Sequence, residues 1–369
     1  MTRAQAAVVD TVGAPFTLQE IELDRPHSNE VVVRLVAAGL CHTDLSVQAG
    51  HLPFPLPGVL GHEGAGVVEA VGAEVTRVRP GDHVVLSFTS CGHCQACGSG
   101  HPAYCATWAM ANVQGRRDDG STTLRRGTEI LGGRFFGQSS FATRSLCDER
   151  SLVRVDPAVP LHVVAPLGCG VQTGIGTVLN VLRPRYGSSL AVFGSGAVGL
   201  SSVIAATWTH ARTIIAVDRV PERLELAGEL GATHTVDAAE LDVTAAIAEI
   251  TSGLGVDCAV ETTGNTRVLR HAVDALAVRG SCAVVGVPPF GTEVSLDVNG
   301  LLAGRRVVGV TEGDSVPESF IPFLVAQYQA GRLPLERLIT EFAFSDIEDA
   351  ARSVLAGETI KPVLRFDTA

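Results

Sequence analysis

The sequence predicts a mixed α/β protein of two domains, in which a region of short strands precedes a doubly wound parallel sheet. Its 369 residues exceed the usual size of one domain, and 46% apolar residues suffice for a large core. Short β-branched runs, separated by turns rich in proline and glycine, fill the first part. After residue 188, apolar strands alternate with helical stretches, a pattern typical of a parallel sheet covered by helices.

Composition narrows the class of protein. The formal net charge of −11 disfavours nucleic acid or an anionic membrane as a partner. Residues 1–5 lack an apolar signal core, so we expect no export, and nine cysteines then favour metal ligation over disulfides. Glycines interrupt the uncharged stretch 187–211, which therefore predicts a strand, a turn and a buried helix instead of a membrane span. We expect a cytoplasmic protein.

The first part begins with short strands, of which residues 31–36 are the clearest β-branched run. Cys41 follows and opens a short helical segment, in which Thr43 and Asp44 lie close by. A loop with three prolines leads to the glycine-rich stretch 61–66, where tight turns can direct His62 and Glu63 inward. Residues 67–71 and 83–86 predict further strands.

Three residues of this part, together with Cys169, form a candidate metal site. Two thiolates and one imidazole, from Cys41, Cys169 and His62, make a ligand set for a catalytic zinc that keeps its fourth position open. Glu63 adds a carboxylate directly beside His62. The alternative is that His62 is an ordinary loop histidine and that the two cysteines are buried as small apolar residues.

A second set of cysteines lies on one short stretch. Cys91, Cys94, Cys97 and Cys105 are separated by two, two and seven residues. Four thiolates at this spacing can close a tetrahedral zinc site with no vacant position, which would hold a long loop in place. An iron–sulfur cluster is the alternative, since thiolates ligate it too.

The stretch between these cysteines and the second domain is less informative. The polar run 116–121 predicts a surface loop or insertion, whereas residues 133–137 are more apolar and return inward. The aromatic side chains there, Phe135 and Phe136, either line a substrate cleft or pack in the core, and the sequence leaves both open.

The second half carries a dinucleotide fingerprint in its full context. An apolar strand at 189–193 is followed by a helical segment and a second strand at 213–217, which ends in Asp218. The turn between strand and helix contains the three glycines that the fingerprint requires, Gly194, Gly196 and Gly199. They permit the tight turn, the approach of the pyrophosphate and close packing of helix on strand, and the helix N-terminus attracts the phosphates.

Asp218 predicts NAD as the coenzyme. A carboxylate there accepts hydrogen bonds from the ribose hydroxyls and repels a 2′-phosphate, although Arg219 softens that repulsion. Alternating elements continue to the C-terminus. We expect helices at 222–230, 266–277, 319–330 and 347–356, and strands at 256–261, 281–287 and 362–366.

Taken together, these motifs resemble the zinc-containing alcohol dehydrogenases of the medium-chain dehydrogenase/reductase superfamily. The likeness rests on the stretch Gly61-His62-Glu63-x-x-Gly66 with Gly72, on the two cysteine sets and on the fingerprint, and it covers nearly the whole chain. Residues 135–141, Phe-Phe-Gly-Gln-Ser-Ser-Phe, look most like the aryl (benzyl) alcohol dehydrogenase branch. The resemblance implies a GroES-like, mostly β catalytic domain at 1–170 and 312–369, and a Rossmann coenzyme domain at 171–311.

The resemblance also implies roles for single residues. Cys41, His62 and Cys169 would hold the catalytic zinc, with Glu63 as a neighbouring or transient ligand. Asp44 would accept a hydrogen bond from the other ring nitrogen of His62, and Thr43 would take the proton of the substrate. Phe88 and Phe136 would line the substrate pocket. The implied coenzyme contacts are His42, Thr173, Val198, Arg223, Val285, Val287 and Lys361, of which Arg223 meets the adenosine ribose and Lys361 the pyrophosphate.

Three positions depart from well-known relatives. Ser46 stands where the outer histidine of a proton relay is found, so the proton must leave by another route. His42 replaces an arginine and would hold phosphate less firmly. Ala109 stands where the glutathione-dependent formaldehyde dehydrogenases carry an arginine, which disfavours oxidation of a thiol adduct as the alternative activity.

The sequence therefore predicts an NAD-dependent, zinc-dependent alcohol dehydrogenase. The expected reaction is reversible oxidation of a primary alcohol, aromatic or allylic, to its aldehyde, with two zinc ions per chain. We expect a homodimer or homotetramer, since members of the family usually assemble so. A catalytically silent protein that only binds NAD is the alternative from another class.

Overall fold

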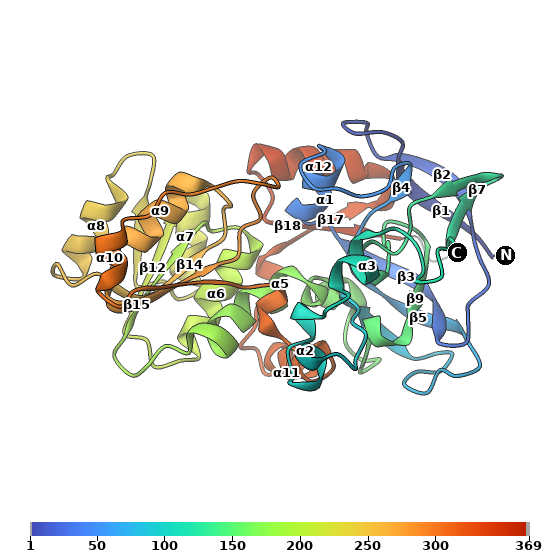
Figure 1. Ribbon diagram of the computed structural model, residues 1–369, viewed down its shortest axis with the longest axis horizontal. Helices are drawn as coiled ribbons and strands as arrows, with labels where there is room; N and C mark the ends of the chain where they lie inside the picture. The colour runs from blue at the N-terminus through green and yellow to red at the C-terminus, as the bar shows by residue number, and fades with distance from the viewer. Residues whose placement is uncertain (1, 367–369) are drawn as a thin grey trace. The chain divides into compact units, whose positions relative to one another are not determined.

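The computed structural model describes residues 2–366, which divide into two compact units (Figure 1). The first unit comprises the chain up to Cys169 and again from Val316 onward, and the second is Gly170–Ser315. The boundaries expected from the sequence, after residues 170 and 311, differ from these. Residues 312–315 belong to the second unit because Glu312 and Ser315 bond to Gln172 there.

Two sheets build the first unit. One has five strands in the order β4-β1-β2-β7-β8, and the other has the order β10-β6-β5-β3-β18-β17, with β9 also paired to β3. The strands are β1 (Thr2–Val9), β2 (Thr17–Leu23), β3 (Glu30–Gly39), β4 (Gly58–Val59), β5 (Glu63–Val71), β6 (His83–Leu86), β7 (Leu124–Arg126), β8 (Glu129–Leu131), β9 (Arg144–Asp148), β10 (Leu152–Val155), β17 (Ile339–Ala343) and β18 (Lys361–Arg365). Helices complete the unit at α1 (His42–Gln48), α2 (Gln95–Gly98), α3 (Trp108–Val113), α4 (Leu161–Val164), α11 (Pro317–Gln329) and α12 (Ile347–Ala356).

Strand β3 organises this unit, because its C-terminal end lies between β5 and β18. Its β-branched residues are buried on both faces, as expected for a central strand. The register pairs Gly39 with Glu63 on one side and with Val363 on the other. A Cβ atom on Gly39 would lie 2.0 Å from Oε2 of Glu63, so glycine is required for that carboxylate to occupy its place. Glu63 and the start of β18 are thereby brought together.

The second unit is a six-stranded sheet in the order β13-β12-β11-β14-β15-β16, parallel throughout. The strands are β11 (Ser189–Phe193), β12 (Thr213–Asp218), β13 (His234–Asp237), β14 (Val256–Glu261), β15 (Leu276–Val284) and β16 (Arg306–Gly309). Helices pack against it at α5 (Gly170–Gly176), α6 (Ala197–Thr207), α7 (Pro221–Glu229), α8 (Val243–Ile250), α9 (Thr266–Asp274) and α10 (Val298–Leu302). The predicted combination of a mostly β unit and a doubly wound parallel sheet is confirmed.

Two expected element boundaries are wrong. The helix predicted to reach residue 277 ends at Asp274, because Leu276 already pairs with Val256 in the parallel ladder. The strand predicted to reach residue 287 ends at Val284, since the next two backbone N–H groups both donate to the carbonyl of Glu261 and turn the chain. In both cases the neighbouring strand sets the limit.

The polar run 116–121 is a loop with mostly exposed residues, as expected, but Arg117 within it departs from that expectation. Arg117 is only 5% exposed, and its Nε and Nη2 donate to the two carboxylate oxygens of Glu30 at 2.8 Å. Arg134 donates to the same carboxylate at 2.9 Å. Burial favours the uncharged form of Glu30, but the hydrogen bonds from Arg117 outweigh it and lower the pKa of this carboxyl. The arginine is therefore part of the interior.

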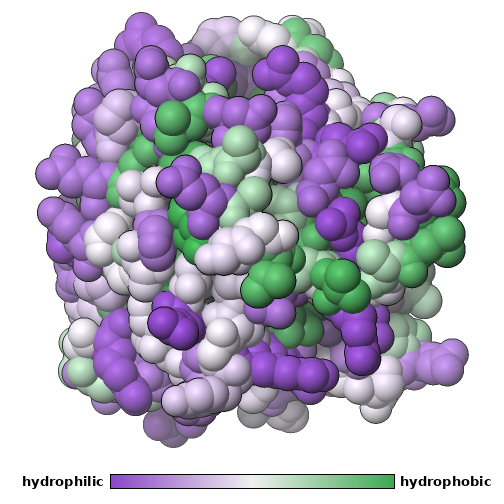
Figure 2. Space-filling model, turned by 90° about the vertical axis from the view of Figure 1, so that its left-hand side faces the viewer, coloured by the Kyte–Doolittle hydropathy of each residue, from purple (hydrophilic) through white to green (hydrophobic). Residues whose placement is uncertain are grey.

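The stretch 187–211 forms β11, a turn and the buried helix α6, as expected. Among the described residues, no single helix is long and apolar enough to cross a membrane. One bent pair of helices, residues 161–168 with 170–182, reaches that length and apolar composition only when the two helices are taken together. Figure 2 shows hydrophobic side chains lying among hydrophilic ones on the face toward α8 and α10. Exposed apolar residues of the second unit include Leu254, Val278 and Leu302.

Candidate functional site

Four side chains of the first unit converge on one point, which we call the mixed cluster: Cys41, His62, Glu63 and Cys169. Their candidate ligand atoms all lie within 4.8 Å of one another. Cys41 is the N-cap residue of α1, His62 directly precedes β5, and Cys169 follows a short 3₁₀ turn. These residues come from three separate segments of the chain, Cys41, the adjacent His62 and Glu63, and Cys169, so the pairing of β3 with β5 and the turn before Cys169 create the cluster.

The Asp44 carboxylate holds the mixed cluster in shape. Its Oδ2 accepts from the backbone N–H of Cys41 at 2.9 Å, which caps α1. Its Oδ1 lies 3.0 Å from the backbone nitrogen of Gly61 and 3.0 Å from Nδ1 of His62. With Nδ1 facing Asp44, Nε2 of His62 points into the cluster. This Nε2 is buried and has no hydrogen-bond partner within the described chain, as expected of a metal-ligating nitrogen.

Electrostatics favour the metal-binding form of the Cys41 thiol. A hydrogen bond with Cys169 holds the pKa of Cys41 well below its usual value; burial opposes this shift, and the cations Lys361 and His62 add to it. Burial alone would lower the pKa of His62, but the charges of Asp44 and Cys41 raise it well above its usual value. A metal cation that both side chains can ligate displaces the proton of the imidazolium and compensates the charge of the thiolate. The donor set and the orphaned Nε2 therefore fit zinc.

Lys361 corrects one expectation. The resemblance placed its ammonium against the coenzyme pyrophosphate, but the side chain is only 3% exposed and belongs to the mixed cluster. Its Nζ lies 2.9 Å from each oxygen of Glu63 and 3.3 Å from the carbonyl oxygen of Leu40, which uses all three of its donors. Burial opposes the charge of Lys361, yet Glu63 raises its pKa well above the usual value. The pair keeps both charges compensated inside the unit.

An aromatic wall covers the histidine. The ring of Phe136 stacks on that of His62 at a centroid distance of 4.5 Å and an interplanar angle of 27°. Phe135 meets His62 edge-on at 5.5 Å, and Trp108 meets Phe136 edge-on at 5.4 Å. Phe136 adopts a left-handed backbone, with φ of 50°, which turns its ring toward the histidine. Trp108 was not singled out from the sequence, because nothing near it marks it as part of a site.

The remaining expected residues of the first unit lie around helix α1. The hydroxyl of Thr43 is 3.8 Å from Sγ of Cys41, and its side chain is half-buried. His42 is exposed on the first turn of the helix, whereas Ser46, one turn further on, is buried. Phe88 is buried in the main apolar core of the unit. These positions leave Thr43 as the hydroxyl nearest the mixed cluster on this helix.

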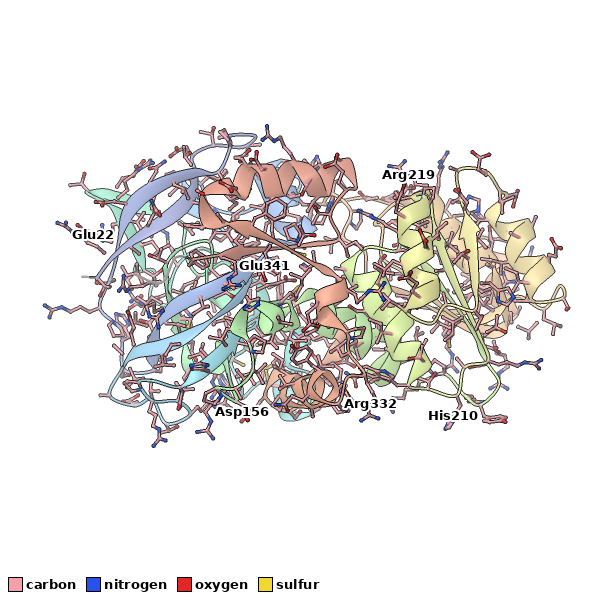
Figure 3. The ribbon with its side chains drawn as sticks, turned by 180° about the vertical axis from the view of Figure 1, so that it is seen from behind. Glu22, Asp156, His210, Arg219, Arg332 and Glu341 are labelled. Atoms are coloured by element: carbon pink, nitrogen blue, oxygen red, sulfur yellow. The ribbon has the colours of Figure 1, made fainter. Side chains whose placement is uncertain are left out.

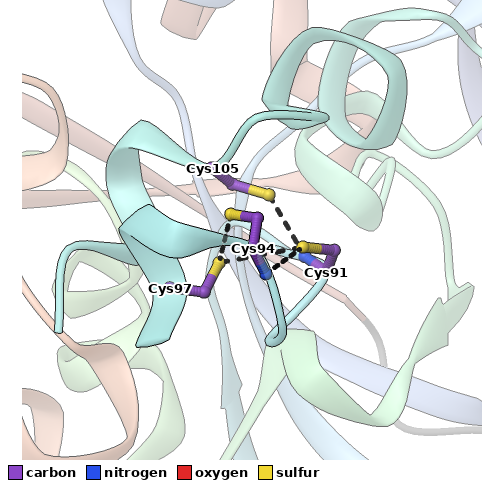
Figure 4. A group of neighbouring side chains, drawn as sticks. All are labelled: Cys91, Cys94, Cys97 and Cys105. Atoms are coloured by element: carbon purple, nitrogen blue, oxygen red, sulfur yellow. Dashed lines mark hydrogen bonds between the residues drawn. The ribbon is translucent and has the colours of Figure 1, made fainter. Parts of the chain in front are cut away.

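The second metal-binding candidate is the four-cysteine loop, Cys91, Cys94, Cys97 and Cys105 (Figure 4). Sγ of Cys97 lies 3.5 Å from that of Cys94 and 4.0 Å from that of Cys91. Thiolates around a tetrahedral zinc, each about 2.3 Å from the ion, lie about 3.8 Å apart, so the spacing fits. Backbone N–H groups of Ala106 and Cys97 lower the pKa of Cys94 to about 6, whereas burial raises the pKa of Cys97 to about 11.

In the second unit, the turn between β11 and α6 has the shape that a pyrophosphate requires. Gly194 has φ of +95°, and a Cβ atom on Gly199 would lie 1.8 Å from the carbonyl oxygen of Gly194. Around Gly196, the N-cap residue of α6, a Cβ atom would meet open space. The hydroxyl of Ser195 is buried and has no hydrogen-bond partner among residues 2–366. These features fit an anion held at the N-terminus of α6.

Asp218 ends β12 beside this turn. Its Oδ2 accepts from the backbone nitrogen of Ser195 at 2.5 Å, and its Oδ1 accepts from those of Arg219 and Val220. The side chain of Arg219 is exposed (Figure 3). The other expected coenzyme residues of this unit are half-buried Val198, Arg223 and Val285, buried Thr173 and exposed Val287.

The sequence and the structure both resemble those of known dehydrogenases. Residues 27–157 match the family described as the alcohol dehydrogenase GroES-like domain, and residues 197–326 match the zinc-binding dehydrogenase family. A geraniol dehydrogenase of Castellaniella defragrans is 42% identical over 98% of both chains. The crystal structure of benzyl alcohol dehydrogenase from Acinetobacter calcoaceticus is 45% identical, with a TM-score of 0.96 over 100% of both chains. An alcohol dehydrogenase zinc-binding domain protein from Burkholderia ambifaria is 50% identical, also with a TM-score of 0.96 over 100% of both chains.

A mostly β unit with a thiolate-rich candidate metal site, in one chain with a dinucleotide-binding sheet, is typical of a metal-dependent oxidoreductase that uses a nicotinamide coenzyme. The chain belongs to the zinc-containing alcohol dehydrogenases of the medium-chain dehydrogenase/reductase superfamily. The predicted family and enzyme class, with zinc and a nicotinamide dinucleotide as cofactors, are thereby confirmed. The ligand set of two thiolates and one imidazole is the one for which alcohol dehydrogenase is the known example.

Proposed function

We propose that this protein oxidises primary alcohols with an aromatic or allylic group next to the carbinol carbon, using NAD. The observation that carries this substrate class is the ring of Phe136 stacked on His62, with Trp108 edge-on behind it. A flat, conjugated substrate packs on such a wall better than a flexible aliphatic chain does. Relatives named for geraniol and benzyl alcohol support the same class.

In this proposal Cys41, His62 and Cys169 hold the catalytic zinc, and the four-cysteine loop holds a second ion. When bound, zinc supplies a Lewis acid for the alcohol oxygen while the nicotinamide ring accepts the hydride. Asp44 keeps Nε2 of His62 directed at the ion by occupying Nδ1. Lys361 keeps Glu63 paired, so this carboxylate stays beside the ligands without leaving an uncompensated charge.

Proton transfer falls to Thr43, whose hydroxyl is the nearest to Cys41 on helix α1. A hydroxyl donates and accepts at once, so it can take the proton of the substrate and pass another one on. Ser46 is buried two helical positions beyond Asp44 and has no ring nitrogen to continue the relay. We propose that the proton leaves from Thr43 without a histidine at position 46.

Asp218 supports NAD over NADP, because its carboxylate ends β12 where the adenosine ribose is expected. The domain roles follow the units, with catalysis in the first and coenzyme binding in the second. We further propose a homodimer or homotetramer in the cytoplasm. All nine cysteines are free thiols, which agrees with a reducing compartment.

Steady-state kinetics with NAD and NADP across benzyl, allylic and short aliphatic alcohols test the proposal. We expect kcat/KM for the benzyl and allylic alcohols to exceed that for short aliphatic alcohols by at least about tenfold. Metal analysis of the same sample should give two zinc ions per chain. A preference for ethanol, or for an S-hydroxymethyl thiol adduct, would contradict the substrate class.

A further inference from the structure

Glu312 is a buried acidic residue of the second unit and belongs to neither candidate metal site. It lies just beyond β16, and Val310 before it donates to the carbonyl of Val284 at the end of β15. Glu312 is thus at the edge of the sheet where the parallel strands end, on the side of β15 and β16. Asp218 ends β12 on the opposite side of β11. A dinucleotide spans this edge from one side to the other, so the nicotinamide end belongs to the side of Glu312.

The carboxylate of Glu312 is held in place by residues of helix α5. Its Oε2 accepts from Nε2 of Gln172 at 3.3 Å and from the hydroxyl of Thr173 at 3.5 Å, and the side chain is only 6% exposed. The hydroxyl of Ser315 lies 3.0 Å from Oε1 of Gln172 and 2.6 Å from the carbonyl oxygen of Glu312, so it ties Gln172 to this turn. The amide of Gln172 and the hydroxyl of Thr173 both donate to Oε2 of the Glu312 carboxylate.

The backbone at this position is also unusual. Glu312, Gly313 and Asp314 all have positive φ, of 49°, 66° and 48°, a conformation that is uncommon for residues other than glycine. The turn is pressed onto α5, since a Cβ atom on Gly313 would lie 2.5 Å from the carbonyl oxygen of Gln172. Strained backbone and a buried charge both oppose folding, and such features gather at functional sites.

Thr173 connects this turn to the coenzyme site. The next residue on α5 is Gly174, where a Cβ atom would lie 2.2 Å from the carbonyl oxygen of Val198. Helix α5 therefore packs tightly against the first turn of α6, which carries the phosphate-binding glycines. The carboxylate, Thr173 and the glycine turn form one rigid arrangement within the second unit.

We propose that Glu312 raises the affinity of the coenzyme site for the oxidised nicotinamide dinucleotide and leaves that for the reduced form nearly unchanged. The oxidised ring carries a positive charge and the reduced ring carries none. A carboxylate fixed beside Thr173, in surroundings poor in water, therefore stabilises only the oxidised form. The inference rests on the proposed function, because it requires the nicotinamide end to lie on this side of the sheet.

The test compares the binding of NAD⁺ and NADH to the full-length, zinc-loaded protein without any alcohol. NADH binding is followed by its fluorescence, and NAD⁺ binding by displacement of NADH. We expect Glu312→Gln, which has the same shape without the charge, to raise the Kd of NAD⁺ about tenfold and that of NADH less than about twofold. Glu312→Asn is the second variant, because asparagine tolerates a positive φ and should fold even if the glutamine variant does not. Glu293→Gln removes an exposed carboxylate of the same unit and should change neither constant.

Each outcome has one meaning. A rise of both dissociation constants by the same factor would show that Glu312 only supports the fold of the site. Unchanged constants would show that its charge does not stabilise the nicotinamide ring. Either result overturns the inference. If the wild-type protein bound neither coenzyme, the proposed function itself would fail. A selective loss of NAD⁺ affinity in both variants, and not in Glu293→Gln, supports the inference.

Discussion

The mixed cluster and the four-cysteine loop are both candidate zinc sites, yet they are built in opposite ways. The four-cysteine loop takes every ligand from a stretch of 15 residues, Cys91 to Cys105, and lies partly exposed. The mixed cluster takes its ligands from Cys41, the His62-Glu63 pair and Cys169, and the pairing of β3 with β5 brings the first two segments together. A local site can be recognised from spacing, whereas an assembled site depends on the fold around it.

The surroundings of the two sites differ as well. In the mixed cluster, Asp44 orients His62, Lys361 pairs with Glu63, and Phe136 covers the imidazole ring. Around the four-cysteine loop, the thiols contact mainly one another and nearby backbone N–H groups. A site for chemistry needs oriented ligands and controlled charge, whereas a closed site only needs its four ligands. The difference predicts how each site responds to mutation.

The largest effect is expected at Cys169. Cys169→Ala removes one ligand of the proposed catalytic zinc, so kcat for benzyl alcohol should fall at least about a thousandfold, because the Lewis acid is lost. Zinc content should drop from two ions to one per chain, while the melting temperature stays close to that of the wild type. Turnover above one-tenth of the wild-type rate with one zinc per chain would show that Cys169 is not a ligand of the working metal.

Asp44→Asn should have the next largest effect. The amide keeps the size of the side chain but loses the charge that orients His62, and loss of such a partner usually lowers metal affinity or activity about 10- to 100-fold. Titration with a zinc chelator should remove one ion more readily than from the wild type. The second ion, in the four-cysteine loop, serves as the internal control and should leave at the wild-type chelator concentration.

Cys97→Ser should affect stability far more than chemistry. Removing one thiolate opens the closed site, so we expect loss of one zinc and a clearly lower melting temperature. Molecules that remain folded should turn over benzyl alcohol within about threefold of the wild-type rate, since this loop supplies no group to the mixed cluster. A fully stable variant with one zinc, or a folded variant without activity, would erase the distinction between the two sites.

Glu30→Gln should have the smallest effect on turnover. The ion pair of Glu30 with Arg117 joins residues that are far apart in the chain, but it takes no part in the chemistry. The pKa of Glu30 is lowered in the folded protein, so its contribution to stability is present above pH 4.5 and is lost as the pH falls through the folded value. Denaturant unfolding at pH 7 should show the variant to be less stable by about 3 kcal/mol, since Arg117 loses its buried partner. On acidification from pH 5 to about pH 3 the difference should shrink. An equal difference at both pH values would exclude the ion pair as its cause.

The sequence by itself determined the two-part architecture and predicted every residue of both candidate metal sites. Strand β11, the glycine turn and Asp218 could be recognised because the phosphate-binding turn imposes its residues locally. The four cysteines could be recognised because their spacing alone brings four thiols together. These features depend on neighbours in the chain, and a linear pattern records them.

Only the tertiary structure decided where the side chains of Lys361, Arg117 and Glu312 lie. Lys361 pairs with Glu63 because β18 lies against β3, a contact that no local pattern contains. Arg117 is buried on Glu30 although its polar neighbours predicted a surface loop. Glu312 faces Thr173 because a turn of left-handed residues is packed onto α5. A charged side chain is buried when a partner from a distant segment compensates its charge, and that partner is known only once the chain has folded.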